Sequence, residues 1–361
     1  MKNFPLTEMA VKMFCPGNVV EIDDAGLPSI MVYIPKFKNS DVLAGGDDST
    51  HPAFIVNGRE IDGFYYSKYQ NVVHNGRAYS LPGEDLPTEM SFNEALESSE
   101  AKGYGWHLST NAEWAAVALW CKANGFLPFG NNNLGKDNRE TEYKAILAQN
   151  NCDTVVTGTG PLTWSHNRTE SGIWDMNGNV AEFQGGVRIV WGELQILANN
   201  DAADPDNPQN EASTCWKAIN AADGTLVTPE SKTTDTTAIL SGKTIRVDLI
   251  NKAWTYCTTV TNPGTTYYTC KFNALACTDD ISTAAKNLLR SLALLPEEGA
   301  SESDYAGDTV FINRNMREFM LYRGGDSKEG TSSGIFNCSF ATRRDTFPTY
   351  SGFRAAYIPN I

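Results

Sequence analysis

The residues that could do chemistry in this sequence are concentrated in one stretch, residues 172–183, which reads Gly-Ile-Trp-Asp-Met-Asn-Gly-Asn-Val-Ala-Glu-Phe. Apolar anchors alternate there with Asp, Asn and Glu around Gly178, which predicts a tight, polar, hydrogen-bonded turn. Asp175 and Glu182 flank backbone carbonyls that can converge on one point, and such an oxygen-only set suits a hard cation such as calcium. An Asx-type turn without metal fits the same spacing, so the residues alone leave both interpretations open.

Cysteine and histidine, which bind transition metals and act as nucleophiles, show no site-like spacing. None of the eight cysteines lies in the Cys-x-x-Cys pair of a zinc ribbon or redox motif. The four histidines, His51, His74, His107 and His166, are scattered along the chain without the spacing of metal ligands. These residue types therefore identify no metal or redox centre.

Charge and hydropathy narrow the classes of partner. The formal net charge of −14 repels phosphate backbones, and no run of Lys and Arg overcomes it locally, so we expect no nucleic-acid partner. The first residues never reach an uninterrupted apolar region of signal-peptide length, and no run approaches the roughly 18 apolar residues of a membrane span. We therefore expect no signal peptide and no membrane insertion.

The elements that must position these residues are short strands and a few helices. Thirty Gly and sixteen Pro favour strands joined by turns. Residues 31–35 and the aromatic-rich residues 61–69 predict strands. Ser91 and Thr110 are suited to cap helices over 92–101 and 111–123. We expect a mixed, loop-rich α+β fold.

Changes in composition divide the chain into segments. Residues 1–26 predict an N-terminal arm, because their apolar residues are irregularly spaced and a Pro-Gly pair breaks any helix. Residues 194–308 begin with a polar stretch and continue into Thr-rich alternating segments, which indicates a β-rich insertion. The remaining segments, 27–193 and 309–361, are expected to form one domain.

The stretch at 172–183 closely resembles the Gly-Leu-Tyr-Asp-Met-x-Gly-Asn-Val-Trp-Glu-Trp signature of the formylglycine-generating enzyme (sulfatase-modifying factor) family. Further landmarks of that family occur in the same order at 31–35, 64–69, 106–114 and 352–355. Together they span nearly the whole chain apart from the arm and the insertion. The resemblance implies a C-type lectin-like fold of the formylglycine-generating-enzyme type for 27–193 and 309–361.

The resemblance also implies roles for residues of the turn. In the enzymes the turn holds calcium, and the matching positions here are Asp175, Gly178, Val180 and Glu182, with Gly and Val contributing backbone carbonyls. The aromatic residue that usually precedes the Glu is Ala181 in this chain. A structural Ca²⁺ at these four positions is what the resemblance implies.

Enzymatic activity is not expected, because the residues of the family's redox centre are missing. Formylglycine generation in the family uses two nearby C-terminal cysteines that bind copper, whereas Cys338 is the only cysteine between Gly325 and Arg354. The iron-dependent relatives use a three-histidine site, which the scattered histidines do not match. We predict a protein that is not an enzyme and has no redox cofactor; an oxidase-type enzyme of the family is the alternative.

The segment at the place of the active site begins with Leu-Tyr-Arg-Gly-Gly at 321–325 and ends with Gly-Phe-Arg-Ala at 352–355. This framing resembles the variable region of target proteins of diversity-generating retroelements, which carry a hypermutated, solvent-facing patch on this fold. Adenine-directed mutation of AAC codons never yields Gln, Met or Trp, and none of these occurs over 322–351. Lys328 and Glu329 lie outside that codon set, and a lectin-fold loop of fixed sequence is the alternative. By register, the residues predicted to vary and to contact ligand are Tyr322, Asp326, Lys328, Glu329, Ser332, Asn337, Ser339, Ala341, Thr342, Phe347, Pro348, Thr349 and Tyr350.

The sequence thus predicts a non-enzymatic ligand- or receptor-binding protein whose surface at 322–351 is diversified by a retroelement. The expected partner is a protein or glycan receptor on a cell surface, and display in a homo-oligomer would add avidity. The expected location is a phage virion or a bacterial cell surface, with a cytoplasmic stage before assembly or release. A structural phage fibre protein that merely retains the fold is a further alternative.

Overall fold

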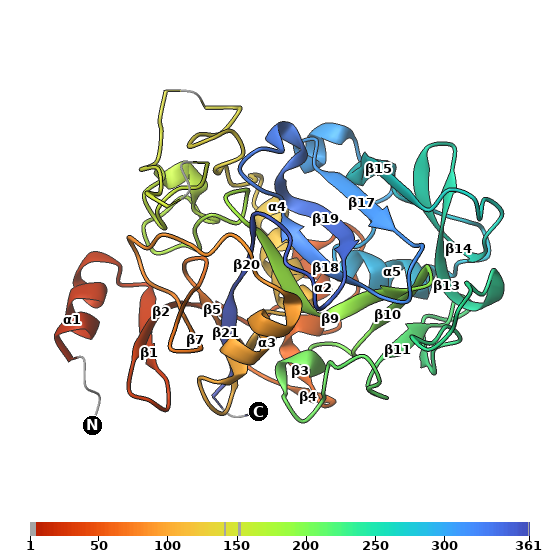
Figure 1. Cartoon of the computed structure of the whole chain (residues 1–361), viewed down its shortest axis with the longest axis horizontal. Helices are drawn as coiled ribbons and strands as arrows, with labels where there is room; N and C mark the ends of the chain where they lie inside the picture. Colours follow the sequence, from red (N-terminus) through yellow and green to blue (C-terminus); the bar gives the residue numbers. More distant parts are fainter. Residues whose placement is uncertain (1–4, 141, 151–152, 360) are drawn as a thin grey trace.

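The computed structural model describes residues 5–140, 142–150, 153–359 and 361, and shows a strand-rich α+β fold (Figure 1). One sheet has five strands, and a second has twelve. The described helices are α1 (Pro5–Phe14), α2 (Asn39–Val42), α3 (Phe92–Glu100), α4 (Asn111–Ala123) and α5 (Thr283–Ser291). The expected α+β class is therefore confirmed.

The five-stranded sheet joins strands from both ends of the chain. Its order is β1 (Asn18–Ile22), β2 (Pro28–Pro35), β5 (Gly63–Ser67), β21 (Ala355–Tyr357) and β8 (Trp106–Leu108). The strands expected at 31–35 and 61–69 are thus present as β2 and β5. Part of the segment expected as an N-terminal arm belongs to this sheet, because β1 pairs with β2 along its whole length.

The twelve-stranded sheet carries most of the C-terminal half. Its main path is β15 (Tyr267–Lys271), β17 (Thr309–Asn313), β19 (Gly334–Thr342), β18 (Phe319–Gly324), β9 (Ala181–Val190), β10 (Glu193–Ile196), β13 (Ser241–Ile250), β14 (Ala253–Thr259) and β16 (Ala276–Cys277). Three strands lie off this path: β11 (Lys217–Ile219), β12 (Leu226–Val227) and β20 (Ser351–Phe353), the last of which pairs with β9. Two small hairpins complete the strands: β3 (Ile55–Val56) with β4 (Arg59–Glu60), and β6 (Val72–His74) with β7 (Arg77–Tyr79).

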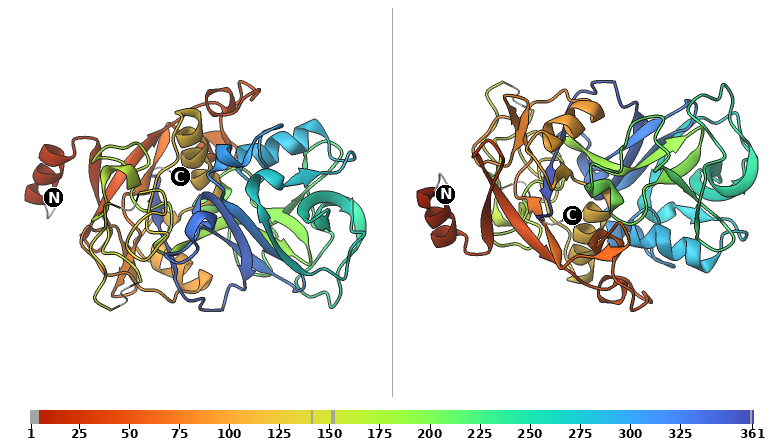
Figure 2. Two further views of the ribbon diagram at one scale, coloured as in Figure 1. Left: turned by 90° about the horizontal axis from the view of Figure 1, so that it is seen from above. Right: turned by 90° about the horizontal axis from the view of Figure 1, so that it is seen from below.

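The segment expected as an insertion, 194–308, extends this sheet at both ends. Strands β13, β14 and β16 continue it beyond β10, and β15 adds to its opposite edge by pairing with β17. Figures 1 and 2 place α1 at one end of the molecule and the β13–β14 region at the other.

The two helices expected after β7 form as the sequence indicates. The Ser91 hydroxyl accepts a hydrogen bond from the backbone N–H of Glu94, and Thr110 does the same for Glu113, which completes a capping box at each helix. Helix α4 is almost wholly buried and packs against β9 and α5. All ten residues of β9 are buried as well. Helix α4 and strand β9 therefore belong to the core, and the C-terminal strands β18 and β20 pair with β9.

No helix among the described residues has the length and apolar character needed to cross a membrane.

Candidate functional site

Residues 172–183 form the tight turn that the sequence predicts, and the turn leads directly into β9. Asp175 and Asn179 adopt left-handed backbone conformations, with φ of 61° and 67°. A Cβ atom added at Gly178 would lie 2.1 Å from the backbone oxygen of Asn131, so only glycine fits there. The polar atoms of the turn are thereby held inside the protein.

The oxygen atoms at the four positions matched to calcium ligands do converge on one point. The backbone oxygens of Asp175, Gly178 and Val180 and the Oε1 atom of Glu182 lie 3.1, 3.3, 3.0 and 2.9 Å from a single atom, Nε2 of Gln70. Asp175 takes part through its carbonyl, while its carboxylate accepts a hydrogen bond of 3.3 Å from the backbone N–H of Gly158.

These distances are those of hydrogen bonds to an amide nitrogen, whereas calcium–oxygen bonds measure about 2.3–2.6 Å. A calcium ion and the Gln70 amide cannot occupy the same point, so the turn in this form fits the amide and does not fit the ion. Among the residues in the described ranges, no group of three or more His, Cys, Asp and Glu side chains is placed to hold a metal. The calcium site implied by the resemblance is thus not confirmed by the geometry of the turn.

A buried ion pair fixes the position of Glu182. Arg354 donates from Nε to Glu182 Oε2 at 2.8 Å and from Nη2 to Oε1 at 3.0 Å. It also donates to the backbone oxygens of Lys68 and Trp174. Burial raises the pKa of Glu182 and Arg354 opposes the rise, while burial raises the pKa of Asp175 to about 6. The turn, β5 and the end of the chain are thus bound together.

The residues predicted to vary lie on β18, on β19 and in the loops that follow these strands, and we call this set the C-terminal face. Strand pairing sets Tyr322 opposite Ser339. Asn337 donates from Nδ2 to Glu329 Oε2 at 3.2 Å and to the backbone oxygen of Ser332 at 2.8 Å. The C-terminal face comprises Tyr322, Asp326, Lys328, Glu329, Ser332, Asn337, Ser339, Ala341, Thr342, Phe347, Pro348, Thr349 and Tyr350.

Exposure differs across the C-terminal face. Its exposed members are Lys328, Glu329, Phe347 and Thr349, and its part-buried members are Tyr322, Asp326, Ser332, Ala341, Pro348 and Tyr350. Asn337, Ser339 and Thr342 are only 4, 8 and 7% exposed, so the expectation that they face solvent is wrong for the isolated chain. Asn337 hydrogen-bonds to the loop at 326–333, and Ser339 lies opposite the large side chain of Tyr322 on the neighbouring strand.

Two loops form the exposed part of the C-terminal face and are linked to each other. The Lys328 ammonium forms an ion pair of 2.7 Å with Asp153, and the Tyr350 hydroxyl donates to the same carboxylate at 2.7 Å. Lys328 also lies 4.5 Å from the centre of the Tyr350 ring. The loops at 326–333 and 343–350 are therefore held side by side.

Several residues that lie between or next to the positions predicted to vary are buried. Arg323, Ile335, Phe336 and Phe353 are at most 1% exposed. Arg323 donates from Nε and Nη2 to Asn111 Oδ1 at 3.1 and 2.8 Å, which anchors β18 to the start of α4. Arg323, Ile335, Phe336 and Phe353 thus form a buried framework beneath the C-terminal face.

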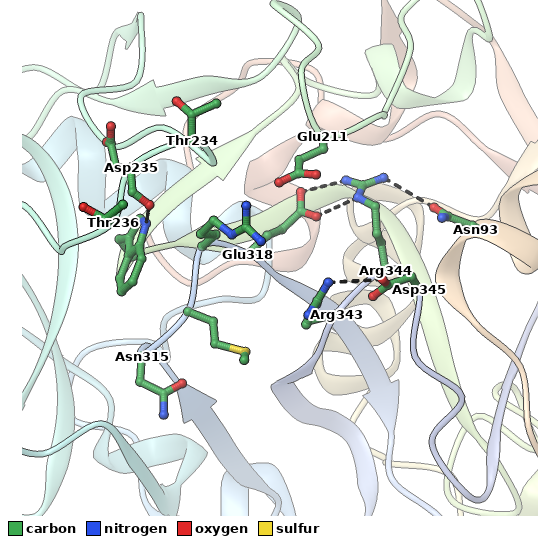
Figure 3. Close-up of a pocket in the computed structure, with 13 residues that line it drawn as sticks. Asn93, Glu211, Thr234, Asp235, Thr236, Asn315, Glu318, Arg343, Arg344 and Asp345 are labelled. Atoms are coloured by element: carbon green, nitrogen blue, oxygen red, sulfur yellow. Dashed lines mark hydrogen bonds and ion pairs between the residues drawn. The ribbon is translucent and has the colours of Figure 1, made fainter.

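A pocket that the sequence did not indicate opens beside the loop at 343–350 (Figure 3). Near its base Glu318 binds two arginines, Arg188 at 2.7 Å and Arg344 at 2.6 and 2.7 Å. Figure 3 shows Arg344 between Glu318 and Asn93, so its guanidinium is already bound by protein groups. Glu318, just before β18, therefore holds Arg344 of the loop at 343–350 close to Arg188 of β9.

The buried histidines lie in separate environments. His107 pairs with Glu113 at 2.9 Å, and His51 contacts the backbone oxygen of Ser291 at 2.8 Å. His166 is buried too, and burial lowers the pKa of His166 to about 3. His107 and His51 thus contact protein groups within the core, as expected for core histidines.

The sequence matches no protein-family model, and no curated protein matches it.

Proposed function

We propose that this chain is a non-enzymatic binding protein with a C-type lectin-like fold of the formylglycine-generating-enzyme type, whose C-terminal face is diversified by a retroelement. The observation that carries the proposal is the contrast within 322–353. Strands β18, β19 and β20 are mostly buried, and the two loops between them are more exposed. These loops contain most of the residues predicted to vary. Substitutions in such loops leave the core contacts intact.

The chemistry of the exposed loops suits recognition of another macromolecule. Phe347 is 55% exposed, which is unusual for a phenylalanine and offers an aromatic anchor. Thr349, Lys328 and Glu329 supply adaptable polar contacts beside it. We propose a protein or glycan receptor on a cell surface as the partner, with the chain displayed on a phage virion or a bacterial cell surface.

The oxidase-type alternative is disfavoured by the environment of Cys338. This thiol is fully buried, and burial raises its pKa, although the neighbouring Arg323 opposes the rise. A reactive cysteine needs an exposed thiolate, and Cys338 has the opposite character.

Helix α1 supports a second candidate role, in assembly. Leu6, Met9, Ala10, Met13 and Phe14 recur at helical spacing and are all exposed. An isolated helix of about ten residues is marginal in water, so this apolar stripe needs a partner to be stable. We propose that α1 forms a contact between copies of this chain in a homo-oligomer. Such an assembly fits both a receptor binder that gains avidity and a structural fibre protein.

The DNA that flanks the gene tests the main proposal. Retroelement diversification requires a reverse-transcriptase gene and a near-copy of the 322–351 coding segment that differs from it where the copy has adenine. Both features together are the expected result. A flanking region with neither would overturn the proposal of diversification and leave the fixed-sequence alternative.

A further inference from the structure

We infer that the side-chain amide of Gln70 takes the place of a calcium ion in the turn at 172–183, so that this turn is stable without metal. The inference is independent of the proposed ligand and depends only on the resemblance of the turn and on the contacts around Gln70.

The first support is the number of oxygens around one nitrogen. Nε2 of Gln70 lies 2.9–3.3 Å from three backbone oxygens and one carboxylate oxygen, all at the positions matched to calcium ligands. Gln70 itself is 1% exposed, so water does not compete for these contacts. The NH₂ group has two N–H donors, which the four oxygens share, and its partial positive charge reduces the repulsion among these oxygens.

The second support is that the amide orientation is fixed by its other end. Oε1 of Gln70 accepts a hydrogen bond of 2.9 Å from Nδ2 of Asn179. Asn179 is oriented in turn, because its Oδ1 accepts from the backbone N–H of Val155 at 2.8 Å and from Nδ2 of Asn131 at 3.1 Å. A reversed Gln70 amide would place an oxygen against four oxygens and an NH₂ group against another NH₂ group.

The third support is charge. Calcium brings two positive charges and is bound most tightly where carboxylates balance them. Glu182 is already neutralised by Arg354 in a fully buried pair, and the Asp175 carboxylate is turned toward the Gly158 backbone. The oxygens that face Nε2 thus suit a neutral donor better than a divalent ion.

The test starts with the unmodified protein, purified without chelator. We expect no stoichiometric calcium by plasma mass spectrometry and the same Tm in millimolar calcium as in EDTA. One calcium ion per chain, or a Tm that falls in EDTA, would overturn the inference.

Two variants extend the test, Gln70→Ala and the control Gln195→Ala, which removes another fully buried amide that binds Glu193 and Ser231. Both should lower the Tm in EDTA, but only Gln70→Ala should recover part of the loss when calcium is added. Equal responses of the two variants to calcium, or a Gln70→Ala variant as stable as the unmodified protein, would contradict the inference. If Gln70→Ala does not fold, the calcium content of the unmodified protein decides.

Discussion

The guanidinium of Arg354 and the carboxylate of Glu182 meet through two hydrogen bonds, at 2.8 and 3.0 Å, and neither side chain is exposed to solvent. Glu182 lies in β9, and Arg354 lies between β20 and β21. The pair therefore connects the twelve-stranded sheet to the five-stranded sheet. Arg354 follows directly after β20, the strand that comes next after the loop at 343–350.

Glu182→Gln should destabilise the fold by about 3–5 kcal/mol, because it leaves the Arg354 charge buried without a partner. Urea unfolding measures the loss. The matched control is Glu60→Gln, which breaks an exposed pair with Lys36 of 3.0 Å and should change the free energy of unfolding little. Similar losses in both variants would show that the buried pair has no special role.

The buried carboxyl group of Asp308 should make the free energy of unfolding depend on pH. Burial raises the pKa of Asp308 to about 8; its Oδ2 atom accepts from the backbone N–H of Phe336 at 2.8 Å, while Oδ1 has no hydrogen-bond partner among the residues that the structure describes. Between pH 4 and pH 8, roughly, the folded state keeps a proton that the unfolded state has released, so Asp308 lowers stability as the pH rises through this window. Each unit by which the pKa differs between the folded and unfolded states changes the free energy of unfolding by about 1.4 kcal/mol.

Asp308→Asn should therefore gain stability relative to the unmodified protein as the pH rises from 5 to 8, because an amide cannot titrate and can still accept from Phe336. Asp175 has a raised pKa as well, but it contributes to both proteins and cancels in the difference. Denaturant unfolding at several pH values gives the two curves. If the free energies of unfolding of the two proteins change with pH in parallel, Asp308 is not the group that causes the pH dependence.

The link between the two loops of the C-terminal face predicts an effect on backbone motion. Lys328→Met removes the ion pair with Asp153 and the contact with Tyr350. Amide hydrogen exchange should become faster at 326–333 and 343–350, while the Tm stays nearly unchanged, because these residues lie outside the core. As a control, Lys252→Met at an exposed turn should leave exchange in both loops unaltered. Unchanged exchange in the Lys328 variant would mean that the loops are ordered by other contacts.

Helix α1 predicts an effect on association. Replacing both Met9 and Met13 by Ser makes the apolar stripe polar and should shift the chain toward the monomer in light scattering after size exclusion. Lys12→Ser, outside this stripe, should leave the oligomeric state as it was. A chain that is monomeric before any substitution would contradict the proposed role of α1 in a homo-oligomer.

Sequence alone could predict the elements whose signals are local. Ser91 and Thr110 indicated the starts of α3 and α4 correctly, since capping depends on residues three positions apart. The convergence of oxygens in the turn was also predictable from its spacing. Gln70 was not, because it lies more than 100 residues from the turn in sequence and reaches it only after β5 and β9 are in place.

The burial of Asn337 and Ser339 could not be predicted for a similar reason. The two residues are separated by one position in β19. Asn337 is buried by its hydrogen bonds to the loop at 326–333, and strand pairing sets Ser339 opposite Tyr322 of β18. Periodicity shows which residues share a side, and tertiary packing decides whether that side meets solvent.

The central claim is that the C-terminal face varies while the framework beneath it is fixed, and sequencing this gene from many related isolates tests it most directly. The account predicts amino-acid differences clustered within 322–351 at codons derived from adenine, with Arg323, Phe336 and Phe353 unchanged. Differences scattered evenly along the chain would contradict it.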